Sequence, residues 1–303
     1  MISRKGRVGV IGATSIIGEF LLPLLVEDGY DVMAFSRRDI KSEKRKNVRW
    51  QMISFSKSTV ISDINEGKIQ IALWVCLAPV NALTEFLPVF LTYGARKIVV
   101  VSSTSLFTKK SSADLGEKKL AEKIADNENT FVHWAAKAKV SFTVLRPTMI
   151  YGRGRDKNVN FIASFIRWFS FFCIPGKAEG LRSPIHAQDV AMACKAALGS
   201  EKVANRFYNI SGGEVLTYRE MVCRIFSAMG KKPRFLSLPE RFFRPAIFLL
   251  RLLPPFRQLS VAMLDRMNQD LVFDNAEAIR DLNFSPRSFR PDADDLKRER
   301  ERE

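Results

Sequence analysis

An alternation of short apolar runs with helical patterns constrains the fold more than any other feature of the sequence. The apolar runs are typical of buried strands, and segments with helical periodicity lie between them. The predicted strands are Arg7–Ile11, Asp31–Phe35, Ile71–Leu77, Lys97–Val101 and Ser141–Leu145. The predicted helices between them are Ser15–Glu27, Asn81–Tyr93 and Ala113–Lys139. This order predicts an α/β fold built on a doubly wound parallel sheet with right-handed crossovers.

A glycine-containing turn joins the first predicted strand to the first helix. In the segment GATSIIG, Gly12 permits a tight turn and Gly18 allows the helix to pack closely on the strand. The small Ser15 lets a pyrophosphate approach the backbone at the helix N-terminus. An ordinary βα turn is the alternative, but the strand before and the helix after favour a dinucleotide-binding turn of the Rossmann type. The predicted contacts are Gly12, Thr14, Ser15, Ile16, Ile17 and Gly18.

The residues that follow the second predicted strand select the nucleotide. An NAD site carries Asp or Glu at this point to bind the ribose 2′-hydroxyl. This chain has Ser36, Arg37 and Arg38 instead. Two guanidinium groups and a hydroxyl suit a 2′-phosphate, so we predict NADP as the cofactor in preference to NAD. The alternative is a solvated basic loop.

The second half of the chain differs from the first in composition and in its pattern of predicted elements. It contains an aromatic segment at Asn160–Ile174, helical patterns at Ile185–Ala197 and Thr217–Gly230, and a strand-like run at Phe207–Ile210. We expect residues 1–150 to form a nucleotide-binding domain to which 184–212 return. A smaller α-rich substrate lobe is expected from residues 151–183 and 213–291, and a charged tail from residues 292–303.

A series of motifs runs in order along nearly the whole chain. They are GATSIIG, WVCLAP, VVVSSTSLF, VLRPTMIYGRGRDKN, RSPIHAQDVA, FYNISGGEVLTYREM and VFDNAEAIRDLNFSPR. Together they resemble the extended branch of the short-chain dehydrogenase/reductase superfamily, the NAD(P)-dependent sugar-nucleotide epimerases and dehydratases. The resemblance implies that Leu77, Ala78 and Pro79 pass under the cofactor.

The resemblance also implies a catalytic set, which this chain carries only in part. The family uses a Ser or Thr together with a Tyr-x-x-x-Lys arrangement, in which the tyrosine is the general acid or base. Ser103 matches the serine, with Thr104 adjacent, and Lys119 is placed on the lysine. Leu115 then stands where the tyrosine should be, and no tyrosine lies between Ser103 and the strand beginning at Ser141.

Several alternatives follow from the missing tyrosine. Placing Lys118 on the motif lysine gives Asp114 at the tyrosine position, and both lysines could equally be solvated helix charges. Asp114, Glu117 or Glu122 could supply the proton, the substrate could supply its own acid, or the site could bind NADPH without turnover. His133 lies in an apolar helical stretch that is typical of packing.

The predicted substrate residues come from the same resemblance. Arg182 matches an arginine that grips a nucleotide diphosphate, for which a fork of donors is suited. Tyr151 and Asn158 lie in the loop where the family reads the sugar, and Arg266 resembles a second diphosphate-binding arginine. Either arginine could instead be a surface charge. His186 and Asp189 are interpreted as structural residues of a turn and a helix N-terminus.

Composition limits the remaining possibilities. Four scattered cysteines and two histidines form no metal-ligand or disulfide pattern, so we expect no metal and a reducing, cytoplasmic location. The net charge of +16 suits anionic small molecules. No nucleic-acid-binding motif is present, so nucleic acid is not an expected partner. The arginine-studded apolar segment 245–263 is either a cover of the substrate cleft or a contact with a membrane or protein partner.

These features predict an NADP-dependent epimerase, dehydratase or reductase that acts on a nucleotide-linked sugar or a similar anionic substrate. They do not decide whether the chain forms a homodimer. The alternative is a catalytically impaired protein that holds NADPH as a structural or sensing element. In that case the chain resembles the nicotinamide-binding accessory subunit of respiratory complex I.

Overall fold

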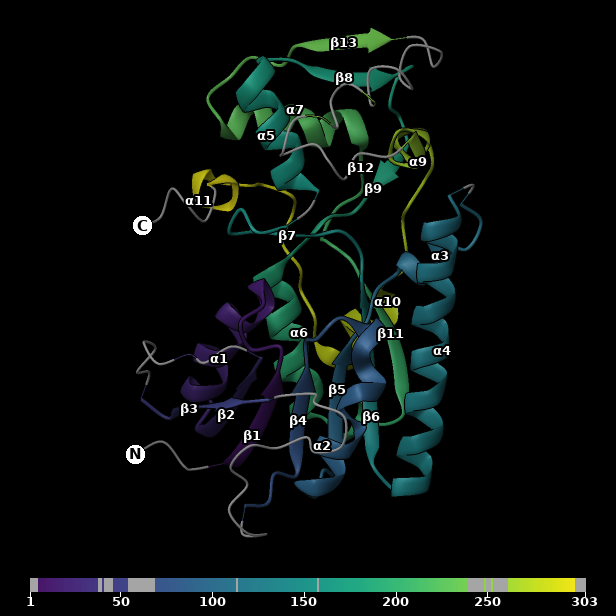
Figure 1. Cartoon of the computed structure of the whole chain (residues 1–303). Helices are drawn as coiled ribbons and strands as arrows, with labels where there is room; N and C mark the ends of the chain where they lie inside the picture. Colours follow the sequence, from purple (N-terminus) through teal and green to yellow (C-terminus); the bar gives the residue numbers. More distant parts are fainter. Residues whose placement is uncertain are drawn as a thin grey trace.

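A computed structural model of the chain consists of two lobes stacked one above the other (Figure 1). It describes residues 5–37, 40, 46–53, 69–112, 114–156, 158–238, 248, 252 and 261–297. The larger lobe contains a parallel sheet and its flanking helices, and the smaller lobe is formed mainly by later parts of the chain. Within the described residues, no helix has the length and apolar character needed to cross a membrane.

The sheet of the larger lobe has seven strands in the described part of the chain, in the order β11-β6-β5-β4-β1-β2-β3. They are β1 (Gly6–Ile11), β2 (Tyr30–Ser36), β3 (Val48–Met52), β4 (Leu73–Cys76), β5 (Lys97–Val101), β6 (Ser141–Pro147) and β11 (Arg206–Ile210). Every neighbouring pair is parallel. The chain reverses its direction of growth between β1 and β4, which is where doubly wound sheets bind ligands. The predicted Rossmann-type α/β fold is confirmed.

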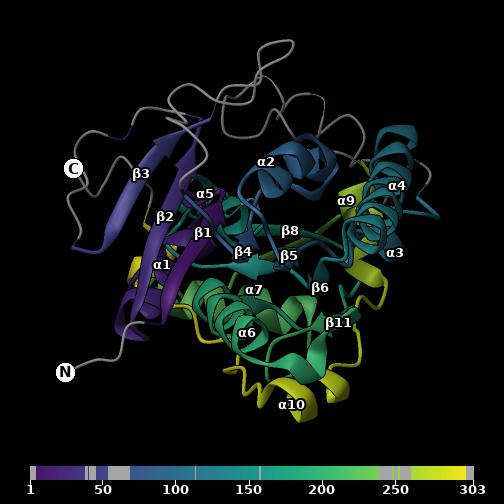
Figure 2. The same ribbon diagram turned by 90° about the horizontal axis from the view of Figure 1, so that it is seen from below.

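Helices cover both faces of this sheet (Figure 2). One face carries α1 (Ile16–Glu27), α6 (Ala187–Gly199) and α10 (Ala276–Leu282). The other carries η1 (Val80–Phe86), α2 (Leu87–Thr92) and α4 (Leu115–Ala138), with the short α3 (Ser105–Thr108) before α4. Each face has its own apolar core, because the strands are buried on both sides.

Two elements of the larger lobe differ from the sequence prediction. The helix predicted over Asn81–Tyr93 is divided into the 3₁₀ turns of η1 and the α-helix α2. Pro88 lies in the first turn of α2, where its missing N–H is tolerated. Strand β3 was not predicted, because among its residues only Val48 is buried and the apolar signal is weak.

The smaller lobe packs around aromatic and aliphatic side chains such as Phe165, Phe172 and Phe226. Its elements are α5 (Val159–Phe169), β8 (Phe172–Pro175), β9 (Leu181–Arg182), β12 (Leu216–Thr217), α7 (Tyr218–Ala228), β13 (Phe235–Leu238), α9 (Val261–Asp265), η4 (Arg266–Asn268) and α11 (Ala293–Leu296). The short η2 (Glu201–Val203) belongs to the larger lobe, where Val203 is buried in the core. The helix predicted from Thr217 begins with a capping box, in which Thr217 and Glu220 are bonded reciprocally at the start of α7. The pair β7 (Ile150–Tyr151) and β10 (Ile185–His186) lies between the lobes.

Two late segments pack differently from the expected division of the chain. Helix α10, expected in the substrate lobe, buries Ala278 and Leu282 in the core shared with α1 and α6. The segment 292–297, expected to belong to a charged tail, buries Leu296 in the smaller lobe. Residues 298–303 and most of segment 245–263 lie outside the described residues.

Candidate functional site

The glycine turn after β1 is a tight backbone cradle. Gly12 has a φ of +74°, and a Cβ there would lie 2.7 Å from the Ala78 nitrogen and 2.8 Å from the Leu77 carbonyl carbon. A Cβ on Gly18 would lie 2.0 Å from the Ala13 oxygen. Only glycine fits these two positions, as the spacing predicts. The turn therefore brings the first helix unusually close to the ends of β1 and β4.

Ser15 ends the turn and begins the helix. Its Oγ accepts a hydrogen bond of 3.1 Å from the Gly18 N–H, and its own N–H donates to the Gly12 oxygen at 2.9 Å. The N-terminus of α1 thus stands directly at the switch point of the sheet. Free N–H groups and the helix dipole make such a terminus a binding site for an anionic phosphate.

A cavity of about 390 Å³, here called the first cavity, opens beside this turn. The predicted cofactor residues that line it are Gly12, Thr14, Ser15, Ser36, Arg37, Leu77, Ala78 and Pro79. Ile17 and Gly18 are buried behind the turn. Arg38 lies outside the described residues. The backbone cradle and the helix N-terminus fit the pyrophosphate of a dinucleotide.

Asn81 and Glu85 also line the first cavity, and the sequence did not single them out. Both come from η1, one turn apart along a 3₁₀ segment that follows β4. The only sequence signal is their position just after Ala78 and Pro79. Their side chains add an amide and a carboxylate to the wall of the first cavity.

A second cavity, also about 390 Å³, lies at the junction of the two lobes. It collects the predicted residues Ile16, Ser103, Thr104, Asn158, Arg182 and Arg266. It is also lined by polar or charged residues that were not predicted, namely Ser105, Thr108, Lys109, Thr148, Arg155, Asp156 and Ser183. Since Ile16 begins α1 directly after Ser15, the second cavity continues from the phosphate-binding turn.

Ser103 and Thr104 play different parts in the second cavity. The Thr104 hydroxyl donates to the Pro147 oxygen at 3.1 Å, so it ties the end of β5 to the end of β6. The Ser103 Oγ accepts from the Ser105 N–H at 3.0 Å. This bond occupies an acceptor position and leaves the Ser103 proton available to donate to a ligand.

A buried network of charged and polar side chains stabilises the strand ends next to Ser103 and Thr104. The Ser102 hydroxyl donates to the Glu128 carboxylate, which also receives the Arg146 guanidinium. The Arg146 guanidinium lies 4.4 Å from the centre of the Phe207 ring and 5.3 Å from that of Phe107. Together these contacts fix the ends of β5 and β6, where Ser103 is carried.

The structure does not bring Lys119 to the second cavity. Its side chain is exposed on α4, as is that of Lys118. Tyr151 is also absent from the lining: its ring is buried between His186 and Phe289, with centroid distances of 5.1 and 4.8 Å. Among the described residues, no tyrosine lines either cavity.

The acidic substitutes for the missing tyrosine are engaged elsewhere. Asp114 caps α4 by accepting from two backbone N–H groups, and Glu122 is exposed. Burial would raise the pKa of Glu117, but hydrogen bonds from Arg266 and Ser112 and the charges of Arg266 and Lys109 hold that pKa below its usual range. Glu117 is therefore a carboxylate at neutral pH and has no proton to give.

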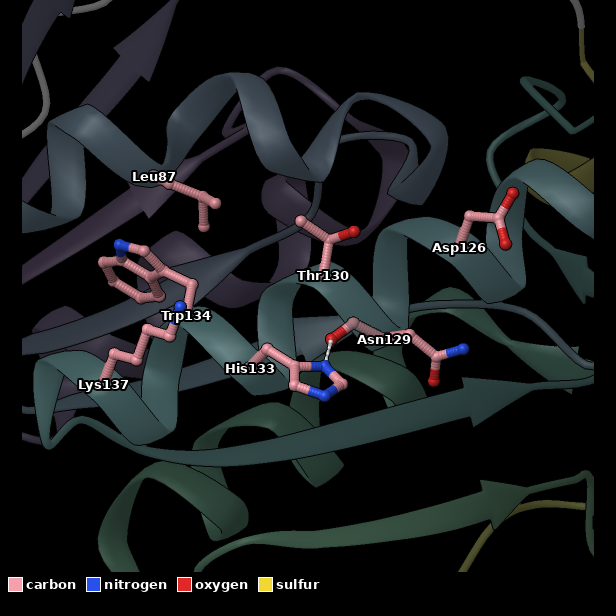
Figure 3. Close-up of a pocket in the computed structure, with 7 residues that line it drawn as sticks. All are labelled: Leu87, Asp126, Asn129, Thr130, His133, Trp134 and Lys137. Carbon is pink, nitrogen blue, oxygen red and sulfur yellow. Dashed lines mark hydrogen bonds between the residues drawn. The ribbon is translucent and has the colours of Figure 1, made fainter.

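His133 faces a separate outer cavity of about 650 Å³ on the far part of α4 (Figure 3). This cavity is lined by Leu87, Asp126, Asn129, Thr130, His133, Trp134 and Lys137. The His133 Nδ1 donates to the Asn129 oxygen at 2.7 Å. The outer cavity shares no lining residue with the second cavity, so His133 is not part of the Ser103 site.

Arg182 is a buried cation whose partners are backbone oxygens. Its guanidinium donates to the carbonyls of Leu181 and Gln269 at 2.7 Å and to that of Arg266. It also lies 5.4 Å from the Tyr218 ring centre. Burial lowers the pKa of Arg182 to about 10, which still leaves it charged at neutral pH. A buried cation held by carbonyls favours an anionic ligand in the adjoining cavity.

Asp156 and Ser183 add two polar atoms to the same cavity wall. The Asp156 Oδ1 caps α5 by accepting from the N–H groups of Asn158, Val159 and Asn160. Its Oδ2 and the Ser183 Oγ are buried and have no hydrogen-bond partner among the described residues. Burial raises the pKa of Asp156 to about 6. Such atoms fit a ligand that carries hydroxyl groups.

Comparison with known proteins agrees with this arrangement. A model of the NAD dependent epimerase/dehydratase family matches residues 78–211. This range begins at Ala78 in the wall of the first cavity and ends directly after β11. The chain is 26% identical over 158 residues to the Arabidopsis thaliana protein "NADH dehydrogenase [ubiquinone] 1 alpha subcomplex subunit 9, mitochondrial". That alignment covers 49% of this chain and 39% of the plant protein, so the chain spans about two fifths of the length of this relative. It is also 21% identical to the uncharacterized protein YbjS of Escherichia coli K12, over 92% of this chain and 93% of that one.

Solved structures of sugar-nucleotide enzymes share the whole fold. A UDP-glucuronic acid 4-epimerase from Bacillus cereus with NAD gives a TM-score of 0.68 at 15% identity, over 96% of this chain and 97% of that one. A UDP-N-acetylglucosamine 4-epimerase from Bacillus cereus gives 0.67 at 17%, over 92% and 93%. MoeE5 with UDP-glucuronic acid and NAD gives 0.64 at 20%, over 93% and 94%. These likenesses show the shared fold, and the family model that matches residues 78–211 agrees with the resemblance carried by the sequence motifs.

Proposed function

From its resemblance to the NAD dependent epimerase/dehydratase family, we propose that the chain is an NADP-dependent epimerase, dehydratase or reductase of a nucleotide-linked sugar or a similar anionic substrate. The observation that carries the proposal is that the phosphate-binding turn touches both cavities, since Ser15 lines the first cavity and Ile16 the second. The phosphate-binding turn opens at Ile16 into a second cavity that holds Ser103 and the buried cation Arg182. A dinucleotide and a second anion would therefore meet beside Ser103.

The cofactor binds along the first cavity in this proposal. Gly12, Ser15 and the N-terminus of α1 hold the pyrophosphate, and Arg37 with Ser36 takes the 2′-phosphate. The nicotinamide supplies or accepts a hydride when the cofactor is bound. What supports NADP over NAD is the lack of an Asp or Glu at the end of β2, where Ser36 and Arg37 stand.

The substrate binds in the second cavity through its charge and its hydroxyl groups. Besides Arg155, which contacts the phosphate-binding turn, three cations among the described residues line this cavity, namely Lys109, Arg182 and Arg266, against one carboxylate, Asp156. Such an excess suits a diphosphate, and structural neighbours were solved with UDP-glucuronic acid and with UDP-glucose. The Asp156 Oδ2 and the Ser183 Oγ offer polar partners to hydroxyl groups of the ligand.

Ser103 is the residue that contacts the reacting oxygen in this proposal. Its acceptor side is taken by the Ser105 N–H, so it donates its proton to a carbonyl or alkoxide oxygen of the substrate. The network of Ser102, Glu128 and Arg146 holds the strand ends that carry it.

A direct experiment is to add UDP-glucuronic acid or UDP-glucose to protein saturated with NADP and follow binding and nicotinamide absorbance. Saturable binding that depends on NADP, with a change in nicotinamide absorbance, supports the enzyme. A protein that takes up neither nucleotide sugar with NADP present contradicts the substrate assignment.

A second function is favoured by the missing phenol. No tyrosine among the described residues lines the second cavity, and general acid–base catalysis typically contributes a factor of roughly 10² to 10⁴. The similarity to the Arabidopsis thaliana NADH dehydrogenase subunit points the same way. The chain would then hold NADPH as a structural or sensing element. Reduction of bound NADP by a nucleotide sugar, or oxidation of bound NADPH by a keto sugar nucleotide, would contradict this second function.

A further inference from the structure

Arg155 connects the smaller lobe to the phosphate-binding turn. Its Nη2 donates to the Thr14 oxygen at 3.0 Å, and its Nη1 forms an ion pair with Glu19. Thr14 belongs to the turn itself, and Glu19 lies in the first turn of α1. A guanidinium from the loop after β7 is thus held at the N-terminus of the helix that would receive the pyrophosphate.

Glu19 places a negative charge at the helix N-terminus to which the phosphate would bind. A carboxylate in the first turn stabilises a helix, but it also repels any anion bound at the same N-terminus. The Glu19 side chain is 34% exposed and the Arg155 side chain 27% exposed, so the pair lies at the edge of the second cavity. An anion bound at Ser15 is therefore repelled by Glu19 and attracted by Arg155. The Arg155 guanidinium can move from the Glu19 carboxylate to that anion.

The loop that carries Arg155 is braced by the C-terminal segment. The Gly154 N–H donates to the Asp295 oxygen at 2.7 Å, and the Arg153 N–H donates to the Asp295 carboxylate at 3.3 Å. That carboxylate also receives the buried His186 ring at 3.1 Å. Arg155 consequently projects from a fixed backbone toward the turn.

We infer that Arg155 is a phosphate-binding residue, an inference that rests on the proposed function. Its guanidinium exchanges the Glu19 carboxylate for the pyrophosphate of the dinucleotide. Arg155 lines the second cavity together with Ile16 and Ser103 and is absent from the lining of the first cavity. The structure therefore assigns it to the phosphate on the nicotinamide side.

The first test is the affinity for NADP, measured by calorimetry, of Arg155→Ala and a matched control. Loss of a charged, forked contact to phosphate should weaken binding by roughly 10- to 100-fold. Arg153→Ala is the control: Arg153 lies on the same loop, with its guanidinium 5.1 Å from the Phe20 ring on α1. It should change the affinity by less than about twofold. Equal losses in both variants would mean a general charge effect and would overturn the inference.

The second test separates phosphate contact from neutralisation of Glu19. Glu19→Gln alone should tighten NADP binding by about two- to fivefold, because a repelling carboxylate is removed. If Arg155 contacts the phosphate, the double variant E19Q/R155A stays at least about tenfold weaker than Glu19→Gln. If the double variant binds as tightly as Glu19→Gln, Arg155 only neutralises Glu19 and the inference is wrong.

A fragment of the cofactor locates the contact. Adenosine 2′,5′-bisphosphate carries the adenine half of NADP but not the phosphate on the nicotinamide side. Its affinity should change by less than about threefold in Arg155→Ala, whereas the affinity for NADP falls by the larger factor. A loss as large as that for NADP would contradict the assignment to the nicotinamide side.

Dinucleotide binding by the wild-type chain and by Arg155→Lys separates a failure of the proposed function from a failure of the inference about Arg155. If the wild-type chain binds neither NADP nor NAD, the proposed function fails and the inference falls with it; if it binds NADP and Arg155→Ala binds equally well, only the inference fails. Arg155→Lys guards against a folding defect, since it keeps the charge but not the forked donors. It should bind NADP with an affinity between those of the wild type and Arg155→Ala; wild-type affinity would contradict a forked contact.

Discussion

Glu117, in the first turn of α4, forms an ion pair with Arg266, which follows α9 near the end of the chain. Both side chains are mostly buried, and Lys109 lies 3.6 Å from the same carboxylate. The pair joins the start of α4 to the segment that closes the second cavity. A residue considered for the proton donor therefore serves to hold a cation of that cavity in place.

This pair predicts a pH-dependent stability. The folded pKa of Glu117 is lowered from 4.5, so its contribution is complete above about pH 4.5 and is lost as the pH falls through the folded pKa. Glu117→Gln should lower the free energy of unfolding by about 1–3 kcal/mol at pH 7 and by less near pH 3. Urea unfolding at both pH values measures the difference. A deficit that is the same at both would contradict the ion pair.

Cofactor choice can be tested at the end of β2. Replacing Arg37 and Arg38 with alanine should weaken NADPH binding much more than NADH binding, because only NADPH carries the 2′-phosphate. We expect a loss of roughly 10-fold or more for NADPH and less than about threefold for NADH. Titration of both nucleotides into the double variant checks this. Equal losses would remove the support for NADP.

Arg182 should separate substrate binding from cofactor binding. Arg182→Ala should weaken nucleotide-sugar binding at least about tenfold and leave NADPH affinity within about twofold. It should also lower the free energy of unfolding, because the carbonyls of Leu181, Arg266 and Gln269 lose a donor. Arg219→Ala is the control, since this guanidinium stacks on Phe235 in the smaller lobe at 4.3 Å. Loss of both ligands, or of neither, would contradict the role of Arg182.

Ser103 and Thr104 should respond in opposite ways. Thr104→Val removes the hydrogen bond to Pro147 and should lower the free energy of unfolding by about 1 kcal/mol. Ser103→Ala should change stability by less than about 0.5 kcal/mol, because water in the cavity can accept from the Ser105 N–H in place of the Ser103 hydroxyl. It should reduce any turnover of a nucleotide sugar at least about tenfold. Thermal unfolding and a turnover assay of both variants test these roles. If Ser103→Ala lowers stability and Thr104→Val lowers turnover, Thr104 is the residue that contacts the substrate and Ser103 is the structural one.

The first cavity could be predicted well because its residues follow one another in short stretches of sequence. Gly12 to Gly18 form one βα turn, and Ser36 and Arg37 end the next strand, so local rules place them. The second cavity could be predicted only in part. Lys109 and Arg155 come from loops that meet only when the two lobes pack together, and no local periodicity marks such positions.

Two predicted residues show why orientation is harder to predict than position. Ile150 lines the second cavity, so its neighbour Tyr151 on the same strand points to the other side, toward His186. Lys119 lies two residues beyond Glu117 on α4, and residues two apart on a helix do not share a face. Glu117 faces Arg266, which leaves Lys119 exposed.

The measurement that tests the central claim most directly is native mass spectrometry of the intact chain after incubation with equal amounts of NADP and NAD. We predict one bound dinucleotide per chain, with NADP in clear excess over NAD, and a further mass when UDP-glucuronic acid or UDP-glucose is added. A chain that retains neither dinucleotide would contradict the assignment of the glycine turn, and with it the function built on that turn.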